Sequence, residues 1–473
     1  MAVVIRRVLV HCQYRRMTRS VIEPQEYPIA PDVPLSLVSR LNALRVFHTG
    51  PGVIRDAGGP VAMVRLGPER LTPPFAVITS PQGARDVLGA TDGAFDKEGL
   101  VHVESRGWGD NVFNLAYEPW LKRRRALQPL FTKKHVASFA GHMAGAAEAL
   151  TDSWIADRTV DLDRECRKLT LRVVGESIFG LDLGDRAQEL GPPIRQALRW
   201  VTHRSTRPVR SPGWLPTPAR HRFRSSLAAI RAVIDEAINA TREDPERNAE
   251  LIRLLLETTD PATGELLTDQ AIGDELFAFV VAGHDTTSTT LSYSLWAMGR
   301  HSVLQDRVAA EVAALGDRPL TVEDVPGLSF TVQVVHEALR ICPPGPVITR
   351  LAMRDVIIDG LRVPAGTNVM IGVYALHHDP ALWTDPERFD PDRFAPGRSA
   401  ERDRWQFLPF GAGQRNCIGS HFAMLEATLG LASIVRRVDI TSKGSTFPVA
   451  LPFTMTAAAP VLADIRARVP ASA

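Results

Sequence analysis

Cysteine is scarce in this sequence, and the spacing of its cysteines excludes two common structural roles. The 473 residues contain only Cys12, Cys166, Cys342 and Cys417. No two of them form a CxxC pair, so the pattern argues against a zinc knuckle and against a disulfide framework. Free thiols are typical of a reducing compartment, and we therefore expect a cytoplasmic location. In such a chain, a single cysteine in an unusual local context is a candidate metal ligand or nucleophile.

Long apolar runs and a large net charge are also absent. No stretch of about 18 or more apolar residues occurs, so no membrane-spanning helix is predicted. The 55 basic and 53 acidic residues leave a net charge of +2, which gives no global attraction to nucleic acid. Within the segment 1–26, residues 1–21 are basic and contain no acid, and their composition resembles that of a transit peptide. We prefer to interpret the segment as a disordered tail, or as an upstream start with Met17 rather than Met1 as the true first residue.

The rest of the sequence, 27–473, has the pattern of one mainly helical domain with small β-sheets, an α+β fold class. The region 120–258 is mostly helical in pattern, and Thr268 is placed to cap a long helix over 269–298. Turn-forming residues from Gly93 to Asn114 predict a long loop. We expect further helices over 81–88 and 330–341, and short strands over 61–66, 76–79, 356–358, 361–363 and 369–373.

The most informative segment is a glycine-rich loop, Phe410-Gly-Ala-Gly-Gln-Arg-Asn-Cys417-Ile-Gly419. Gly411 and Gly413 permit a tight turn beside a flat ring, because neither carries a Cβ. We expect a helix directly after Cys417, whose unpaired N–H groups and dipole would favour the thiolate over the thiol. Phe410 can pack on the sulfur side and exclude water.

This loop resembles the haem-binding signature of the cytochromes P450, FxxGxRxCxG, and matches it at every fixed position. The resemblance implies the cytochrome P450 fold, haem b as the cofactor and Cys417 as the axial iron ligand. Other motifs of the family follow in the expected order from about Lys97 to Gly419. Taken alone, the loop could also be a glycine-rich turn around a buried structural cysteine. Cys342, which stands among prolines, is interpreted in that structural way.

The predicted long helix contains Ala282-Gly-His-Asp-Thr-Thr287 at its middle, directly after an apolar segment. An acid and an alcohol in a buried, apolar setting can form a proton relay. A threonine within a helix can also bond back to the carbonyl four residues earlier. The resemblance, through the pattern AGxDTT, assigns Asp285 and Thr286 a role in oxygen activation. Without the cysteine loop downstream, a Ser/Thr run in a helix would be interpreted as structural.

Glu337 and Arg340 stand three residues apart on a predicted helix, a spacing that is common on exposed helices. The pair becomes informative through the resemblance, because the family has an ExxR motif that is followed by a Pro-Asp/Glu-Arg-Phe box. Two copies of that box follow here, and we prefer Arg393 from the second to Arg388 from the first. A buried Glu337–Arg340–Arg393 network would need full hydrogen bonding, and it would hold the cysteine loop in place.

A haem carries two carboxylates, so the resemblance implies cations beside them. Arg415 stands two residues before the expected iron ligand, where it can reach a propionate. Trp120 and Arg124 have the WxxxR spacing on a helix, from which both can reach one propionate. Arg350 stands where the family usually has a propionate-binding arginine, and Lys97 resembles a contact of some bacterial fatty-acid hydroxylases. For Arg350 and Lys97, the alternative is a solvated surface charge.

The resemblance implies a bacterial-type haem–thiolate monooxygenase that inserts one oxygen atom of O2 into a C–H bond. Only 56 residues follow Cys417, too few for a fused reductase domain. We therefore expect electrons from NAD(P)H through a ferredoxin or flavodoxin and its reductase. The run 122–125, with Lys133 and Lys134, is the expected docking patch for an acidic donor, although it could equally be a solvated helix face. The oligomeric state has no signal, and a monomer is the default.

Apolar residues from three regions are candidates for the substrate pocket, and a lipophilic substrate such as a terpenoid or a fatty acid is expected. They are Val112, Phe113, Phe277, Val281, Val347, Ile348 and Phe453. Two other functions stay open. One is a peroxide-driven or isomerising reaction at the same haem, and the other is a non-catalytic haem- or ligand-binding protein. Neither would require Asp285 and Thr286, whose presence favours the monooxygenase.

Overall fold

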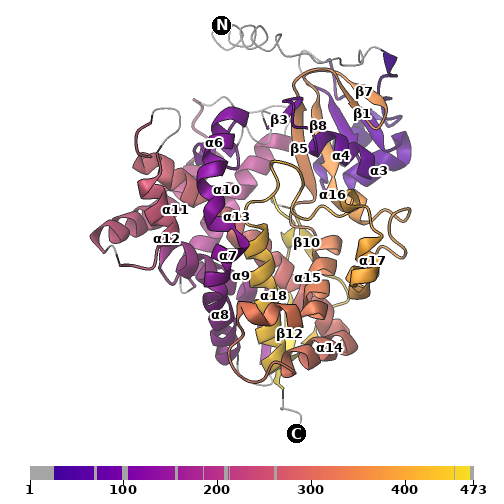
Figure 1. The fold of residues 1–473 in the computed structure, drawn as a ribbon. Helices are drawn as coiled ribbons and strands as arrows, with labels where there is room; N and C mark the ends of the chain where they lie inside the picture. The colour runs from indigo at the N-terminus through magenta and orange to yellow at the C-terminus, as the bar shows by residue number, and fades with distance from the viewer. Residues whose placement is uncertain are drawn as a thin grey trace.

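Helices dominate the structure, and the longest of them, α13 (Asp269–Arg300), runs through its centre (Figure 1). The Thr268 hydroxyl accepts the backbone N–H of Ala271 at 3.2 Å, so the helix begins at the predicted cap. Nearly all of α13 beyond its first turn is buried, because other helices pack around it. The computed structural model describes residues 26–68, 72–97, 105–154, 158–184, 186–206, 211, 214–244, 246–259, 264–451 and 453–468.

The largest apolar core lies where α13 meets α9 (Leu162–Val174), α15 (Ser329–Ile341) and α18 (Ser420–Arg437). Their inward faces carry leucine, isoleucine, valine and alanine at helical spacing, and these side chains are almost completely buried. The helix α8 (Ala140–Ser153) packs on α18 and α9 and extends this core.

A second core joins α13 to α10 (Ala187–Thr206) and α11 (Pro218–Glu243), which pack on each other and lie together on one side of the molecule (Figure 1). The helix α6 (Tyr117–Leu127) contributes Leu127 to this second core. Other helices are α2 (Leu37–Arg45), α3 (Gly50–Gly58), α4 (Pro81–Leu88), α7 (Lys133–Val136), α12 (Glu250–Glu257), α14 (Ser302–Ala313), α16 (Val373–His377) and α17 (Pro396–Ala400).

The main sheet occupies the opposite corner, and its five strands have the order β1-β2-β8-β5-β3. The pair β2–β8 is parallel and the other pairs are antiparallel. These strands are β1 (Val61–Val64), β2 (Phe75–Ile78), β3 (Phe95–Asp96), β5 (Val347–Ala352) and β8 (Asn368–Gly372). The smaller sheets contain β4 (Arg158–Asp161), β6 (Val356–Ile358), β7 (Leu361–Val363), β9 (Val438–Ser442), β10 (Val449–Ala450), β11 (Thr456–Ala457) and β12 (Leu462–Ala467).

This architecture confirms the predicted fold class, mainly helical with small sheets. The bounds of α4, β6 and β7 agree with the predictions, and the structure adds β3 and a 3-10 turn at Arg106–Trp108 inside the predicted long loop. The strand β5 was not predicted. Most of the tail expected at 1–26 lies outside the described residues. No helix in the described part of the chain is long and apolar enough to cross a membrane.

Candidate active site

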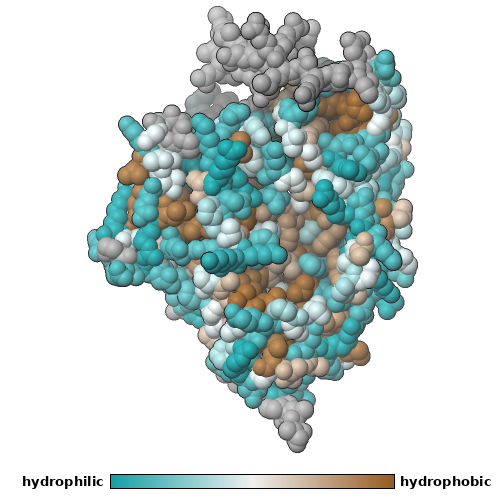
Figure 2. Space-filling model, viewed as in Figure 1, coloured by the Kyte–Doolittle hydropathy of each residue, from teal (hydrophilic) through white to brown (hydrophobic). Residues whose placement is uncertain are grey.

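A cavity of about 430 Å³ lies between α13, α10, β5 and the cysteine loop. This volume is within the range of small-molecule pockets, roughly 300–1,000 Å³. Most residues that line the cavity are apolar, and Cys417 is among them. On the face of the molecule drawn in Figure 2, hydrophobic residues gather in a hollow near α18, within largely hydrophilic surroundings. An apolar ligand would therefore contact mainly apolar side chains beside the cysteine.

The cysteine loop is a tight turn that presents the sulfur of Cys417 to the cavity. Gly411 and Gly413 have φ values of +67° and +71°, a conformation that favours glycine. A Cβ on Gly413 would lie 1.8 Å from the carbonyl oxygen of Leu88, so no other residue fits there. The Cys417 N–H donates to the carbonyl of Phe410 at 2.9 Å, which closes the turn. Phe410 and Gly411 both line the cavity.

The predicted effect of the following helix on the thiol needs correction. The helix α18 begins at Ser420, not directly after Cys417. Burial raises the pKa of the Cys417 thiol, whereas the Gly419 N–H and the charges of Arg124 and Lys97 act to lower it. The protein by itself therefore keeps this thiol protonated at neutral pH, and ligation of a metal ion is what would release the proton.

Three cations, Lys97, Arg350 and Arg415, line the same cavity as Cys417, and Arg350 is buried. Burial lowers the pKa of Arg350 and of Arg415 to about 10, and it lowers the pKa of Lys97 well below its usual value. Arg350 and Arg415 also repel the Lys97 charge, while Asp96 forms an ion pair with Arg415 at 3.0 Å. A bound group with two carboxylates would relieve this excess of positive charge, as the two propionates of a haem do.

Trp120 and Arg124, which are predicted to reach a propionate, lie behind these cations. The Arg415 guanidinium lies over the Trp120 ring, 4.3 Å from its centroid. Arg124 donates to the backbone carbonyl and to the side-chain oxygen of Asn416, both at 3.1 Å. Neither residue lines the cavity. In this structure Trp120 orients Arg415, and Arg124 holds the cysteine loop.

The basic patch predicted at 122–125 is only partly a surface feature. Lys122 and Arg125 are exposed on α6, as are the neighbouring Lys133 and Lys134. Arg123, by contrast, is buried and forms an ion pair at 2.8 Å with Glu275 of α13. The surface that a negatively charged partner can contact therefore consists of Lys122, Arg125, Lys133 and Lys134, and these four residues are called the basic face below.

Thr286 and Asp285 of α13 point in different directions. The Thr286 hydroxyl donates to the carbonyl of Ala282 at 2.7 Å, the expected back-bond, and Thr286 lines the cavity. Asp285 is completely buried but does not line the cavity; its carboxylate accepts hydrogen bonds from Arg167 and from the Thr454 hydroxyl. The expectation of an acid in an apolar setting is wrong for this residue.

The network around Asp285 also determines its charge state. Burial acts to raise the pKa of Asp285, but Arg167 and the Thr454 hydroxyl outweigh it, so the pKa lies below the ordinary value. Arg167 in turn binds Asp163 at 2.8 Å on α9. No spacing in the sequence relates Arg167 to Asp285, because 118 residues separate them. Only the packing of α9 against α13 brings the two together.

Five of the seven predicted pocket residues line the cavity: Phe113, Val281, Val347, Ile348 and Phe453. The other two, Val112 and Phe277, are not among the residues that line it. Val112 turns its backbone N–H toward Glu275 at 3.1 Å, and Phe277 is completely buried behind the Trp108 ring. The lining also includes Trp108 and three residues of α10, which the sequence analysis missed: Leu198, Thr202 and Ser205.

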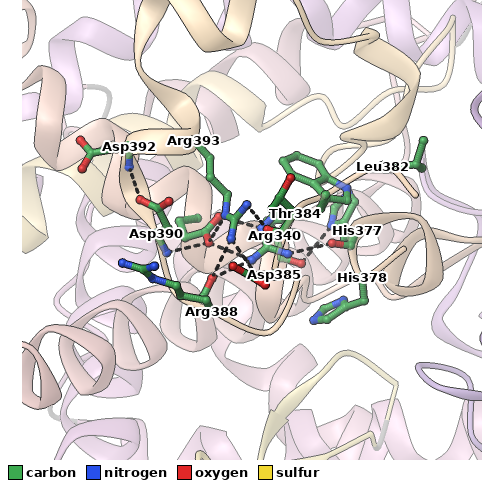
Figure 3. A network of polar contacts seen from close by, with 12 residues as sticks. Arg340, His377, His378, Leu382, Thr384, Asp385, Arg388, Asp390, Asp392 and Arg393 are labelled. Carbon is green, nitrogen blue, oxygen red and sulfur yellow. Dashed lines mark hydrogen bonds and ion pairs between the residues drawn. The ribbon is translucent and has the colours of Figure 1, made fainter. Parts of the chain in front are cut away.

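Glu337 and Arg340 form a completely buried ion pair on α15. The Arg340 guanidinium donates to both carboxylate oxygens, at 2.7 and 2.8 Å. The nearest Arg393 nitrogen is 3.4 Å from Glu337, whereas Arg388 contributes only its backbone carbonyl, 3.3 Å from Arg340 (Figure 3). The Asp390 N–H also donates to Glu337 at 2.9 Å. The carboxylate is thus surrounded by donors, as a buried charge requires.

This network is connected to the cysteine loop through His377. Arg340 donates to the His377 carbonyl at 2.8 Å, and the His377 ring accepts the backbone N–H of Leu408 at 2.9 Å. Leu408 lines the cavity two residues before Phe410. Burial lowers the pKa of His377 well below its usual value, so the ring is neutral and its Nε2 can accept this bond. The ion pair on α15 therefore supports the loop without touching the cavity centre.

The chain was compared with known proteins. The family model described as "Cytochrome P450" matches residues 48–462. A relative from Streptomyces melanosporofaciens, "Cyclooctat-9-en-7-ol 5-monooxygenase", is 33% identical over 386 residues, or 80% of this chain and 82% of the relative. "Pentalenene oxygenase" of Streptomyces avermitilis is 30% identical over 403 residues, 84% of this chain and 88% of the relative. "Protein LUTEIN DEFICIENT 5, chloroplastic" of Arabidopsis thaliana is 26% identical over 445 residues.

Proposed function

Because the chain belongs to the cytochrome P450 family and is a monooxygenase of that class, we propose that its substrate is a lipophilic molecule of the terpenoid class. The observation that carries this proposal is the cavity, which has apolar walls and Cys417 on one side. Two of the relatives named above oxidise terpenoids, which supports this class over a fatty acid. A separate protein, a ferredoxin or a flavodoxin with its reductase, would supply electrons from NAD(P)H.

The residues around the cavity fit a haem b. Cys417 would bind the iron, with Phe410 and Gly411 forming the wall beside it. Arg415, Arg350 and Lys97 would bind the two propionates, and Trp120 and Arg124 would support them from behind. When bound, a thiolate-ligated haem supplies the activation of O2 and the insertion of one oxygen atom into a C–H bond. The protein supplies the orientation of that C–H bond, the exclusion of water and the delivery of protons.

Thr286 is assigned to proton delivery, because its hydroxyl lies on the part of α13 that lines the cavity. Asp285, the other residue of the pair, is held by Arg167 and Thr454. Thr454 also lines the cavity, so its hydroxyl connects the Asp285 carboxylate to the cavity. Thr286 therefore acts at the cavity, and Asp285 acts behind it as an ionised carboxylate that exchanges protons through Thr454.

We expect Thr286→Ala to retain the haem but to divert electrons from product to hydrogen peroxide. A positioned acid–base group contributes about 10²–10⁴-fold to a proton-transfer step, so product formed per NAD(P)H should fall roughly tenfold or more. Thr289→Ala is the matched control, since Thr289 makes the same type of back-bond, to Asp285 at 3.0 Å, but does not line the cavity. Unchanged coupling in Thr286→Ala would contradict the assignment.

The substrate class is tested by titrating the purified holoenzyme with pentalenene and, separately, with palmitic acid. Binding of a ligand in the cavity would be followed by the change that it produces in the Soret band. We expect saturable binding of pentalenene at micromolar concentration and weaker binding of palmitic acid. The opposite order would favour a fatty-acid substrate.

The basic face on α6 and α7 is the proposed docking surface for the electron donor. We expect Lys122→Glu/Arg125→Glu to raise the KM for ferredoxin at least fivefold at low salt, because complementary charge steers association. The difference from wild type should shrink as salt is added. Arg224→Glu, on the exposed side of α11, makes a charge change on another helix and should leave this KM unchanged. Equal effects of both variants would argue against docking at the basic face.

A further inference from the structure

Two adjacent acids of α13, Asp274 and Glu275, bind the loop that carries Trp108 and Phe113. Asp274 accepts the backbone N–H of Asp110 at 3.0 Å, and its other oxygen accepts from Arg231 of α11. Arg231 also donates to the Trp108 carbonyl at 3.2 Å. The first acid thus ties the loop to α13 and to α11 together.

Glu275 repeats this arrangement toward a different helix. One of its oxygens accepts the backbone N–H of Val112 at 3.1 Å, and the other accepts from Arg123 of α6 at 2.8 Å. Glu275 is completely buried and Arg123 nearly so. The second acid therefore ties the same loop to α13 and to α6. It does so at Val112, two residues after the attachment of Asp110 to Asp274.

Gly109 leaves room in the loop for the Asp274 carboxylate. Gly109 has a φ of +97°, and a Cβ at this position would lie 2.1 Å from the Asp274 carboxyl carbon. Within the loop, the Asn114 side chain donates to the carbonyls of Gly109 and Ser105 at 2.8 and 3.1 Å. These internal bonds make the loop a single unit, so holding two of its N–H groups positions all of it.

The held loop forms part of the cavity wall. Trp108 and Phe113 line the cavity, and their rings contact the ring of Phe453 with centroids 5.7 and 6.1 Å apart. Lys97 donates to the Phe113 carbonyl at 3.0 Å, a third attachment. Movement of the loop by even one ångström would change the shape of this aromatic wall. Neither acid lines the cavity, so any influence on a ligand would act through the loop.

We propose that Asp274 and Glu275 are positioning residues that determine the shape of the aromatic wall and, through it, which bulky ligands the cavity accepts. The proposal rests on the proposed function, since it concerns the same cavity. It assigns specificity to two ion pairs that touch no ligand, each joining the loop to a different helix.

The electrostatics of Glu275 explain why the arginine partner matters. Burial raises the pKa of this carboxyl to about 7, even though Arg123 and the Val112 N–H act to lower it. Without Arg123 the carboxyl would be protonated at neutral pH, and without Glu275 the buried Arg123 charge would have no acid beside it. Removing either partner alone is therefore more disruptive than replacing both by neutral groups.

The test uses the holoenzyme and two nitrogen ligands of different size, imidazole and clotrimazole, followed by the shift of the Soret band. Imidazole needs access to the iron only, whereas clotrimazole must also contact the cavity wall. We expect Glu275→Gln to weaken clotrimazole binding about tenfold and imidazole binding less than twofold. The double variant Arg123→Gln/Glu275→Gln, which restores a neutral pair, should recover most of the clotrimazole affinity.

Arg231→Gln tests the other acid by a change that is safer for folding, because the Arg231 side chain is 26% exposed. This variant should also weaken clotrimazole binding, about threefold or more, without weakening imidazole binding to the same extent. An equal loss of affinity for both ligands, or no recovery of clotrimazole affinity in the double variant, would show a general structural role and overturn the proposal. A wild-type protein that binds neither ligand would contradict the proposed function itself, and the assignment of the loop would fail with it.

Discussion

Replacing Cys417 with alanine is expected to eliminate the strongly red-shifted Soret band that the reduced, carbon monoxide-bound wild type should show. The shift requires a haem that is bound by a thiolate, and Cys417 lines the cavity where it would bind the iron. The measurement is the difference spectrum of the dithionite-reduced protein with and without carbon monoxide. Haem content, determined on the same sample, distinguishes loss of the ligand from loss of the whole cofactor.

Cys342→Ala is the matched control for this experiment. Cys342 is also a free cysteine, but it is buried in the apolar core at the end of α15, where burial raises the pKa of its thiol to about 12. Its replacement should leave the red-shifted band in place and cost only some stability. An unchanged spectrum in Cys417→Ala, or a lost band in Cys342→Ala alone, would overturn the assignment of the ligand.

Replacing Glu337 with alanine is expected to cause the largest loss of stability of any single change considered. Both Glu337 and Arg340 are completely buried, so the variant would leave the Arg340 charge in the core without a carboxylate. Breaking a buried pair in this way typically costs about 3–5 kcal/mol. Urea denaturation followed by circular dichroism would measure the loss, and haem content should fall as well, because His377 connects Arg340 to the cysteine loop.

The two neighbouring arginines provide an internal comparison. The Arg393 side chain contacts Glu337 and donates to the carbonyl of Asp385 at 2.8 Å, whereas Arg388 contributes only its backbone carbonyl to Arg340. Arg393→Ala should therefore destabilise the protein measurably, while Arg388→Ala should change the free energy of unfolding by no more than about 0.5 kcal/mol. The reverse order would mean that the wrong copy of the Pro-Asp/Glu-Arg-Phe box had been chosen.

Features that depend on neighbours in the chain could be predicted from the sequence. The cap at Thr268, the bounds of α4 and the pairing of Glu337 with Arg340 follow from spacing, because a helix places residues three and four apart on one face. The turn of the cysteine loop follows from Gly411 and Gly413, since only glycine adopts their backbone angles without strain. The family and the fold class were recognised correctly because these local motifs occur in order.

Features that depend on how remote elements pack were decided by the tertiary structure alone. Neither the Arg167–Asp285 pair nor the Arg123–Glu275 pair has a signal in the sequence, since over a hundred residues separate the partners. The displacement of Val112 from the cavity has the same cause, because the N–H bond to Glu275 turns its segment toward α13. Spacing along a chain determines which residues share an element. Which elements meet, and so which charges are buried together, depends on the shape of the whole core.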